Sequence, residues 1–185
     1  MSITDDYQAA LKRKSDIAGH LPYLNDQAAQ RPGCRIIELG TRTGQSTVAF
    51  LQAAGANGGH VWSIDLDHPK VPAEWYELGS WSFLRADALG GTALAWAPRS
   101  CDLLFIDLDP HSYEQTKQAL NLWLPRVLPG GLALLHDTEF PEINCMPTPV
   151  HESEVGRAVI DWCQRTGLEW RNMPGCFGLG VMQLP

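Results

Sequence analysis

Short apolar runs alternate with longer amphipathic stretches along most of the chain. The apolar runs are "CRIIELG", "HVWSIDLD", "WSFLRAD", "CDLLFID" and "GGLALLHD", and each closes on a glycine or an aspartate. The stretches between them include "GQSTVAFLQAAG", a predicted helix that ends at Gly55, and "SYEQTKQALNLWLPRVL", a second long helix. Strands that read as nearly continuous apolar runs and alternate with helices are typical of a parallel sheet covered on both faces. The pattern therefore predicts an α/β, doubly wound fold.

The remaining segments complete this picture. Residues 4–30 read as helical with a break around Gly19 to Pro22, and Thr4 followed by two aspartates marks a helix start. We expect a short helix from Pro72 to Leu78, a weak helix in "ALGGTALAWA", a helix from Glu154 to Thr166, and closing strands in "LEWRNM" and "FGLGVMQL". The prediction is one domain over residues 1–185. Its expected parts are an N-terminal helical cap (1–30), a cofactor-binding core (31–137), a loop or lid (138–153) and a C-terminal helix with closing strands (154–185).

Composition narrows the class of protein. A hydrophobic fraction of 44% and a charged fraction of 19% over 185 residues are those of a globular chain. The net charge of -7 argues against nucleic acid as a partner, because phosphate binding needs a basic patch. The cysteines nowhere form C-x-x-C, and no apolar run reaches the length of a membrane span. We therefore expect a cytoplasmic protein with reduced thiols and no membrane segment.

The first predicted strand ends in "ELGTRTGQST", which has the features of a ligand loop. Ligands of open α/β sheets bind beyond the carboxyl ends of the strands. A dinucleotide fingerprint, G-x-G-x-x-G, is excluded because Arg42 and Gln45 stand where it needs glycine. The segment instead resembles the first motif of class I S-adenosylmethionine-dependent methyltransferases, E/D-x-G-x-G-x-G, with Arg42 at the middle glycine. The cofactor contacts that this resemblance implies are Glu38, Gly40, Thr41, Arg42, Gly44 and Ser46. The alternative is that the glycines serve only a tight turn.

Acidic residues also close the second and third predicted strands. A carboxylate after the second strand can accept both hydroxyls of a ribose, and Asp65, followed by Leu66, is our choice for this role. Asp67 is assigned to capping the next turn. Asp87, with Ala88, matches the family position that meets adenine. A single aspartate of this kind is as often a helix N-cap, but acidic residues at three consecutive strand ends, Glu38, Asp65 and Asp87, favour an adenosyl cofactor.

The segment from "CDLLFIDLDPHSYE" to "LLHDT" resembles a bacterial group of small O-methyltransferases, methyltransferase family 24-like. The resemblance implies a Rossmann-like, mostly parallel seven-stranded sheet. Related catechol-type and sugar O-methyltransferases hold a divalent metal with an aspartate after the fourth strand and an acidic pair after the fifth. Carried over, the ligands are Asp107, which also borders the cofactor, Asp137 and Thr138. Thr138 replaces the asparagine of the catechol-type group, and His136 replaces the acid of the sugar group.

His111 has two interpretations. An imidazole that titrates near neutral pH, beside the acceptor hydroxyl, can act as the general base, which would make His111 and Asp107 the catalytic pair. Alternatively, His111 caps the helix that begins in "SYEQ", although Ser112 is the better cap by residue type. Asp109 is a second-choice ligand. A metal softer than magnesium would make His136 a ligand as well.

Together these features predict a methyltransferase that uses S-adenosyl-L-methionine, assisted by a divalent metal such as magnesium, to methylate an oxygen of a small-molecule acceptor. One alternative is a metal-independent enzyme that methylates nitrogen or a carboxylate. Another is a non-catalytic adenosyl-binding protein. The chain has only a short N-terminal helical cap and one irregular loop to enclose an acceptor, so either the acceptor is small or a partner subunit completes the pocket. A homodimer is therefore a further expectation.

Overall fold

The computed structural model describes residues 2–140 and 148–185 and contains a seven-stranded sheet with the order β3-β2-β1-β4-β5-β7-β6. Its strands are β1 (Arg35–Leu39), β2 (His60–Asp65), β3 (Trp81–Arg85), β4 (Cys101–Ile106), β5 (Val127–His136), β6 (Trp170–Met173) and β7 (Leu179–Gln183). The first five pair in parallel, whereas β7 runs antiparallel to both β5 and β6. The predicted Rossmann-like, mostly parallel seven-stranded sheet is confirmed.

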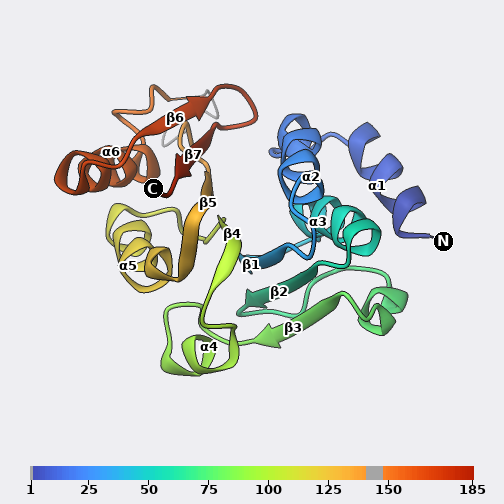
Figure 1. Ribbon diagram of the computed structural model, residues 1–185. Coiled ribbons are helices and arrows are strands. Elements are labelled where there is room, and N and C mark those ends of the chain that lie inside the picture. Colours follow the sequence, from blue (N-terminus) through green and yellow to red (C-terminus); the bar gives the residue numbers. More distant parts are fainter. Residues whose placement is uncertain (1, 141–147) are drawn as a thin grey trace.

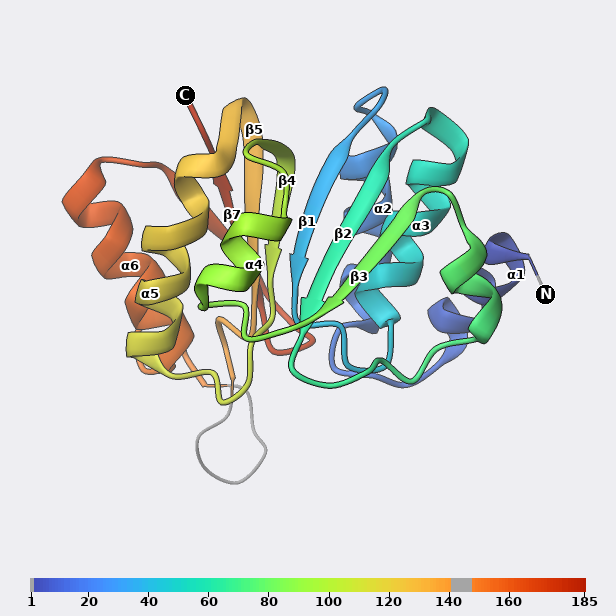
Figure 2. The same cartoon turned by 90° about the horizontal axis from the view of Figure 1, so that it is seen from below.

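Helices cover both faces of the sheet (Figures 1 and 2). The α-helices are α1 (Ile3–Lys12), α2 (Leu21–Ala29), α3 (Gln45–Asn57), α4 (Gly91–Trp96), α5 (Tyr113–Trp123) and α6 (Glu154–Thr166). Short 3₁₀ segments are η1 (Ala18–His20), η2 (Ala73–Glu77) and η3 (Leu124–Arg126). Helices α1 to α3 lie on one face and α4 to α6 on the other (Figure 2). The arrowheads of β1 to β4 point toward the same edge, so their carboxyl ends meet there (Figure 2).

The core consists of two apolar clusters, one on each face of the sheet. Alternate residues of a strand point to opposite faces. Accordingly, Ile36 and Leu103 join the cluster under α2 and α3, and Ile37 and Leu104 join the cluster under α4 to α6. All four side chains are fully buried. Both faces of the central strands are therefore apolar, which is why their sequences read as continuous apolar runs rather than alternating ones.

The N-terminal helical region breaks earlier than its sequence predicts. Helix α1 ends at Lys12, and its start is set by Ser2, which forms a capping box with Asp5. Pro22 does not lie in the break but in the first turn of α2, where its missing N–H group leaves no hydrogen bond unmade. The break therefore covers residues 13–17, and the expected helix start at Thr4 is corrected to Ser2.

Two further boundaries differ from expectation. Helix α3 continues past Gly55 to Asn57 and ends at Gly58, whose φ of 73° is the left-handed conformation of a helix C-cap. The sequence "LPGG" has the residues of a turn but lies within β5.

The part of the chain that the structure describes has no helix both long and apolar enough to cross a membrane.

Candidate functional site

The register of the central strands brings three strand ends to one place. Leu39 pairs with Ile106, and Ile106 pairs with Leu135. The residues that follow these positions, Gly40, Asp107 and His136, therefore lie at the same edge of the sheet. The backbone N–H of Asp107 donates to the carbonyl of Leu39 at 2.8 Å, which continues the ladder by one residue. Strand order changes direction at β1 and β4, the position at which such sheets bind ligands.

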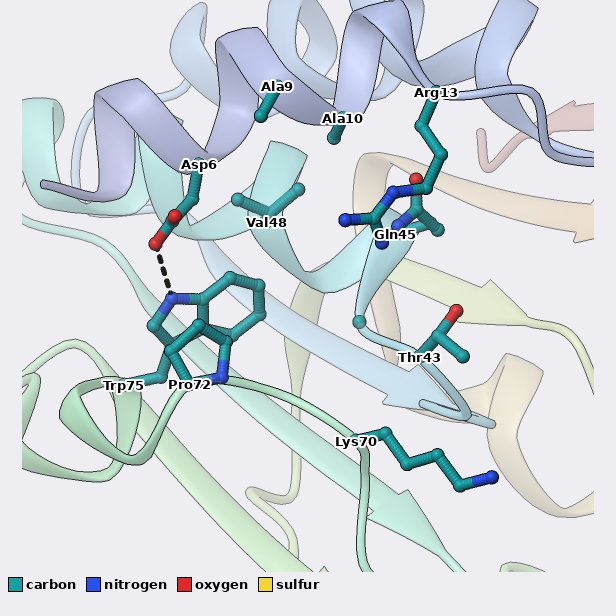
Figure 3. Close-up of a pocket in the computed structure, with 11 residues that line it drawn as sticks. Asp6, Ala9, Ala10, Arg13, Thr43, Gln45, Val48, Lys70, Pro72 and Trp75 are labelled. Carbon is teal, nitrogen blue, oxygen red and sulfur yellow. Dashed lines mark hydrogen bonds between the residues drawn. The ribbon is translucent and has the colours of Figure 1, made fainter. Parts of the chain in front are cut away.

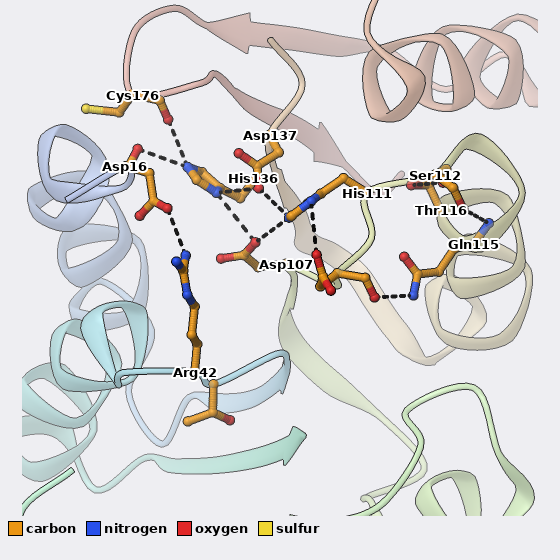
Figure 4. A network of polar contacts seen from close by, with 12 residues as sticks. Asp16, Arg42, Asp107, His111, Ser112, Gln115, Thr116, His136, Asp137 and Cys176 are labelled. Atoms are coloured by element: carbon orange, nitrogen blue, oxygen red, sulfur yellow. Dashed lines mark hydrogen bonds and ion pairs between the residues drawn. The ribbon is translucent and has the colours of Figure 1, made fainter. Parts of the chain in front are cut away.

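Four ionisable side chains converge at this edge (Figure 4). Nε2 of His111 lies 2.9 Å from Oδ2 of Asp137 and 3.8 Å from Oδ1 of Asp107. Nδ1 of His136 lies 3.1 Å from Oδ2 of Asp137 and 3.5 Å from Oδ1 of Asp107. Asp107, His111 and Asp137 alone already offer ligand atoms within 4.8 Å of one another. We call Asp107, His111, His136 and Asp137 the strand-end cluster.

Unusual backbone conformations hold this cluster in place. His111 and Asp137 have φ values of 61° and 65°. These values lie in the left-handed region, which residues other than glycine rarely adopt. Ser112, not His111, is the N-cap of α5, because its side chain accepts from the backbone N–H of Gln115. The capping alternative for His111 is therefore wrong. Its ring stacks on Phe140 at 4.5 Å and turns toward the carboxylates.

Charge coupling within the cluster is strong. Burial by itself lowers the pKa of an imidazole, but the carboxylates of Asp107 and Asp137 raise the pKa of His111 to about 9. The same carboxylates raise the pKa of His136 well above its ordinary value, against the effect of burial. Burial raises the pKa of Asp107, yet the neighbouring imidazoles lower it overall. The expected near-neutral pKa of His111 is therefore corrected: without a bound cation the ring is protonated at pH 7.

Thr138 and Asp109 do not join the cluster in the expected way. The hydroxyl of Thr138 donates to Oδ1 of Asn172 at 2.6 Å and points toward β6 and β7. His136, on the other side of Asp137, occupies the place expected of Thr138. The Asp109 side chain is 93% exposed, and its Oδ1 lies 3.8 Å from Nδ1 of His111. The structure therefore brings His136 to the two aspartates and leaves the other two candidates outside.

Glu38 and Ser46 form a buried support below the loop that follows β1. Glu38 is fully buried and accepts hydrogen bonds from the hydroxyls of Ser46 (2.6 Å), Thr47 (2.9 Å) and Ser63. Burial raises the pKa of Glu38 to about 7, although the three hydroxyl donors act to lower it. Both predicted cofactor contacts thus bond to each other and fix the start of α3. A direct contact with a cofactor stays a prediction.

The loop itself shows why glycine recurs in it. Gly40 has a φ of 91°, and Gly44 has a φ of 74° and lies against Val71 and Trp75, where a Cβ would collide. Arg42, at the middle glycine of the motif, also adopts a positive φ of 48°. Its guanidinium forms an ion pair with Asp16 at 2.9 Å. A side chain is therefore accommodated at position 42 with the backbone conformation that usually calls for glycine.

The second predicted acid supports this loop directly. Oδ2 of Asp65 accepts from the backbone N–H groups of Thr41 (2.7 Å) and Arg42 (2.9 Å), and its Oδ1 accepts from that of Asp67 (3.0 Å). Leu66 follows at the surface with 63% of its area exposed. Asp65 thus ties β2 to the β1–α3 loop, and one of its four acceptor positions remains for a ligand.

The residues after β3 are placed in two different ways. Asp87 accepts from the N–H of Leu89 at 2.9 Å, which is a local turn contact. Ala88 is only 3% exposed, belongs to the core under α4 to α6, and its carbonyl accepts from the indole N–H of Trp123. Asp87 therefore stands at the sheet edge as predicted, whereas the side chain of Ala88 packs inward.

A separate cavity of about 110 Å³ lies between α1, the β1–α3 loop and η2 (Figure 3). Its lining includes Arg13, Thr43, Gly44 and Lys70, and Trp75, whose indole N–H donates to Asp6 at 2.9 Å (Figure 3). None of the four residues of the strand-end cluster lines it. Of the predicted site residues, this cavity contacts only Gly44.

Two contacts of the site were not foreseen. The backbone carbonyls of Asp16 and Cys176 accept from Nε2 of His136 at 3.2 and 2.8 Å. Asp16 and Cys176 lie 120 and 40 residues from His136 in the sequence, so no local spacing predicts these contacts. A backbone carbonyl also carries no side-chain signal that a sequence motif could show.

Comparison with known proteins agrees with this architecture. A family model described as a methyltransferase domain, Methyltransf_24, matches residues 37–138, more than half of the chain. No curated protein sequence matches significantly.

Solved structures match over nearly the whole chain. The methyltransferase PaMTH1 of Podospora anserina, with S-adenosylhomocysteine bound, has a TM-score of 0.68 at 15% identity, covering 99% of this chain and 87% of that one. The O-methyltransferase TomG of Streptomyces achromogenes, in complex with S-adenosylmethionine, has a TM-score of 0.62 at 15% identity, covering 100% and 90%. The TDP-rhamnose 3'-O-methyltransferase CalS11 has a TM-score of 0.63 at 19% identity, covering 88% and 76%.

At these identities the likeness to the solved structures is one of fold. The family match is independent of it and spans the β1–α3 loop and every residue of the strand-end cluster. With that match and the predicted sheet both in place, the chain belongs to the methyltransferase-domain family 24, as the resemblance in its sequence indicated.

Proposed function

We propose that this methyltransferase takes the methyl group of S-adenosyl-L-methionine to an oxygen of a small-molecule acceptor, assisted by a divalent cation at the strand-end cluster. The observation that carries the proposal is the convergence of Asp107, His111 and Asp137 directly beside the glycine loop. The O-methyltransferases among the structural neighbours support oxygen as the methylated atom. The net charge of -7 supports a small acceptor rather than a nucleic acid.

The residues present fit both the cofactor and the cation. Within the described residues, the Thr41 hydroxyl oxygen is buried without a hydrogen-bond partner, and so is Oδ1 of Asp137. Buried polar atoms normally have partners, so unpartnered ones at a sheet edge indicate places for a ligand. Thr41 lies in the loop predicted to meet the cofactor, and Asp137 is one of the predicted metal ligands.

The chemistry assigns distinct tasks to these side chains. In an O-methylation the acceptor oxygen bonds to the methyl carbon, the carbon–sulfur bond breaks with its electron pair left on sulfur, and the hydroxyl proton goes to a base. A divalent cation supplies Lewis acidity, which lowers the pKa of the acceptor hydroxyl. With the cation held by the carboxylates of Asp107 and Asp137, His111 is the base in this proposal and needs to be deprotonated beforehand, because its pKa is about 9 in the metal-free protein. Asp65 and Gly40 position the loop that orients the donor.

Calorimetry with S-adenosylhomocysteine, in magnesium and then in a chelator, tests the proposal. Binding in both conditions, together with methyl transfer that stops on chelation, is the expected result. Absence of any binding heat would overturn cofactor use. Full activity in chelator would favour the metal-independent alternative that methylates nitrogen or a carboxylate. Binding without transfer to any member of a panel of phenols, sugars and amines would favour the non-catalytic alternative.

A further inference from the structure

The tautomer of His136 is fixed by the backbone around it. Its Nε2 faces two carbonyl oxygens, those of Cys176 at 2.8 Å and Asp16 at 3.2 Å (Figure 4). Carbonyl oxygens only accept, so Nε2 carries a hydrogen. In the neutral ring the other nitrogen, Nδ1, therefore presents a lone pair, and it points toward the carboxylates of Asp107 and Asp137.

The Nδ1 lone pair of His136 is buried beside another polar atom that also lacks a hydrogen-bond partner. His136 is 2% exposed, and within the described residues its Nδ1 has no hydrogen-bond partner of acceptable geometry. Oδ1 of Asp137, which is 3% exposed, is also unpartnered. Two buried and unsatisfied ligand atoms in adjacent residues are costly unless something binds them. Both belong to groups that coordinate metal ions.

The distances within the strand-end cluster match those around a single ion. The four nitrogen-to-oxygen separations are 2.9, 3.1, 3.5 and 3.8 Å. With metal–ligand bonds of ~2.1 Å, neighbouring ligand atoms stand about 3.0 Å apart at right angles and about 3.4 Å apart at tetrahedral angles. Each ring nitrogen has one contact in the hydrogen-bond range of about 2.7 to 3.2 Å, to Oδ2 of Asp137, whereas its contact with Asp107 lies beyond that range.

The charge balance of the strand-end cluster also favours a bound cation. Two carboxylates and two neutral imidazoles carry a charge of -2, which one divalent cation balances. The competing arrangement places imidazolium rings at both His111 and His136 beside the same two carboxylates, and it leaves Nδ1 of His136 without a well-aligned acceptor. A carbonyl behind the distal nitrogen of a histidine is the usual support of a metal-bound imidazole.

We propose that Asp107, His111, His136 and Asp137 form a metal centre of two histidines and two carboxylates, with Nδ1 of His136 as a ligand, that prefers a first-row transition ion to magnesium. Imidazole nitrogen suits zinc, nickel, iron or cobalt, whereas magnesium prefers sites made of oxygen alone. This centre deepens the proposed function by naming the class of its cation, and it rests on that proposal only for the use made of the metal. In the metal-bound centre His111 is a ligand and not the base, and the Lewis acidity of the cation lowers the pKa of the acceptor hydroxyl instead.

Cobalt(II) is a suitable probe because its visible absorption reports nitrogen ligands without any enzymatic assay. We expect the chelator-treated full-length protein to bind Co²⁺ with a ligand-field spectrum that a hundredfold excess of Mg²⁺ does not displace. His136→Gln should weaken Co²⁺ binding by about 10- to 100-fold and alter the spectrum. His20→Gln is the matched control: His20 is another buried histidine, with its ring 6.2 Å from that of His136 and its Nε2 on the Gly175 carbonyl.

His111→Gln gives a second test at a less buried ring, 18% exposed, in case His136→Gln does not fold by circular dichroism. It should also weaken Co²⁺ binding by at least about tenfold. Unchanged Co²⁺ affinity in both variants, or Mg²⁺ displacing Co²⁺ at equal concentration, would overturn the proposal. These outcomes are separate from failure of the methyltransferase proposal, which shows as absent S-adenosylhomocysteine binding while the cobalt spectrum persists.

Discussion

Gly40 lies against the main chain of Asp107 with no room for a side chain between them. A Cβ at position 40 would overlap the carbonyl oxygen of Asp107 and press on its carbonyl carbon. The loop after β1 and the end of β4 therefore pack backbone to backbone. The predicted cofactor loop and the strand-end cluster are in this way packed together as one unit.

Replacing Gly40 should disturb both parts of this unit. For Gly40→Ala we expect a loss of about 3 kcal/mol in the free energy of unfolding, from left-handed strain together with overpacking. Gly58→Ala is the control, because Gly58 has a similar positive φ but no atom near its missing Cβ, and about 1 kcal/mol is expected there. Urea denaturation of both variants measures the difference. Equal losses would show that the contact with Asp107 is not the constraint.

The buried Glu38 should make stability depend on pH. Its pKa rises from 4.5 in the unfolded chain to about 7 in the fold, so its stabilising contribution is complete below pH 4.5 and is lost as pH rises through 7. The change in the contribution of Glu38 to the free energy of unfolding over this pH range is about 3 kcal/mol. In Glu38→Gln the free energy of unfolding should vary correspondingly less between pH 4.5 and 7.5. The exposed Glu169→Gln controls for the lost charge, and parallel curves for wild type and Glu38→Gln would contradict the assignment.

Restoring the motif glycine tests the role of Arg42. The ion pair with Asp16 is exposed, with 80% and 34% of the two side chains accessible, so its loss should change stability by less than about 1 kcal/mol. We expect Arg42→Gly to bind S-adenosylhomocysteine no more weakly than wild type in calorimetry. Asp16→Asn removes the ion pair but keeps the Asp16 carbonyl that faces His136. A loss of about tenfold in Arg42→Gly alone would instead assign the guanidinium to ligand binding.

The two aspartates at the ends of β2 and β4 should divide cofactor binding from turnover. Asp65→Ala removes the acceptor of two loop N–H groups as well as the predicted ribose contact, so S-adenosylhomocysteine affinity should fall by about tenfold or more. Asp67→Ala, with a 91% exposed side chain, is the control and should bind normally. Asp107→Ala should abolish methyl transfer and largely spare this affinity. An equal loss of affinity in Asp65→Ala and Asp107→Ala would contradict the division.

The order of strands and helices, and the edge at which the site lies, followed from the sequence. Apolar runs such as "CDLLFID" are local signals, since a buried parallel strand needs apolar residues on both faces. Carboxyl ends of parallel strands meet at one edge, so Asp65, Asp107 and Asp137 were expected together once their strands were recognised. The tight loop after the first strand could also be predicted from its glycines, because the loop leaves no room for side chains at positions 40 and 44.

Which side chains face one another was decided only by the tertiary structure. In a regular strand, neighbouring residues point to opposite sides, but the left-handed φ of 65° at Asp137 breaks this alternation. His136 and Asp137 therefore both reach the cluster, and Thr138 turns to Asn172. The carbonyls that fix the His136 tautomer come from distant segments, and the raised pKa of His111 arises from Asp107, four residues before it, together with Asp137, which follows β5. Apart from the short spacing between Asp107 and His111, sequence spacing encodes none of these relations, because they depend on how separate elements pack in space.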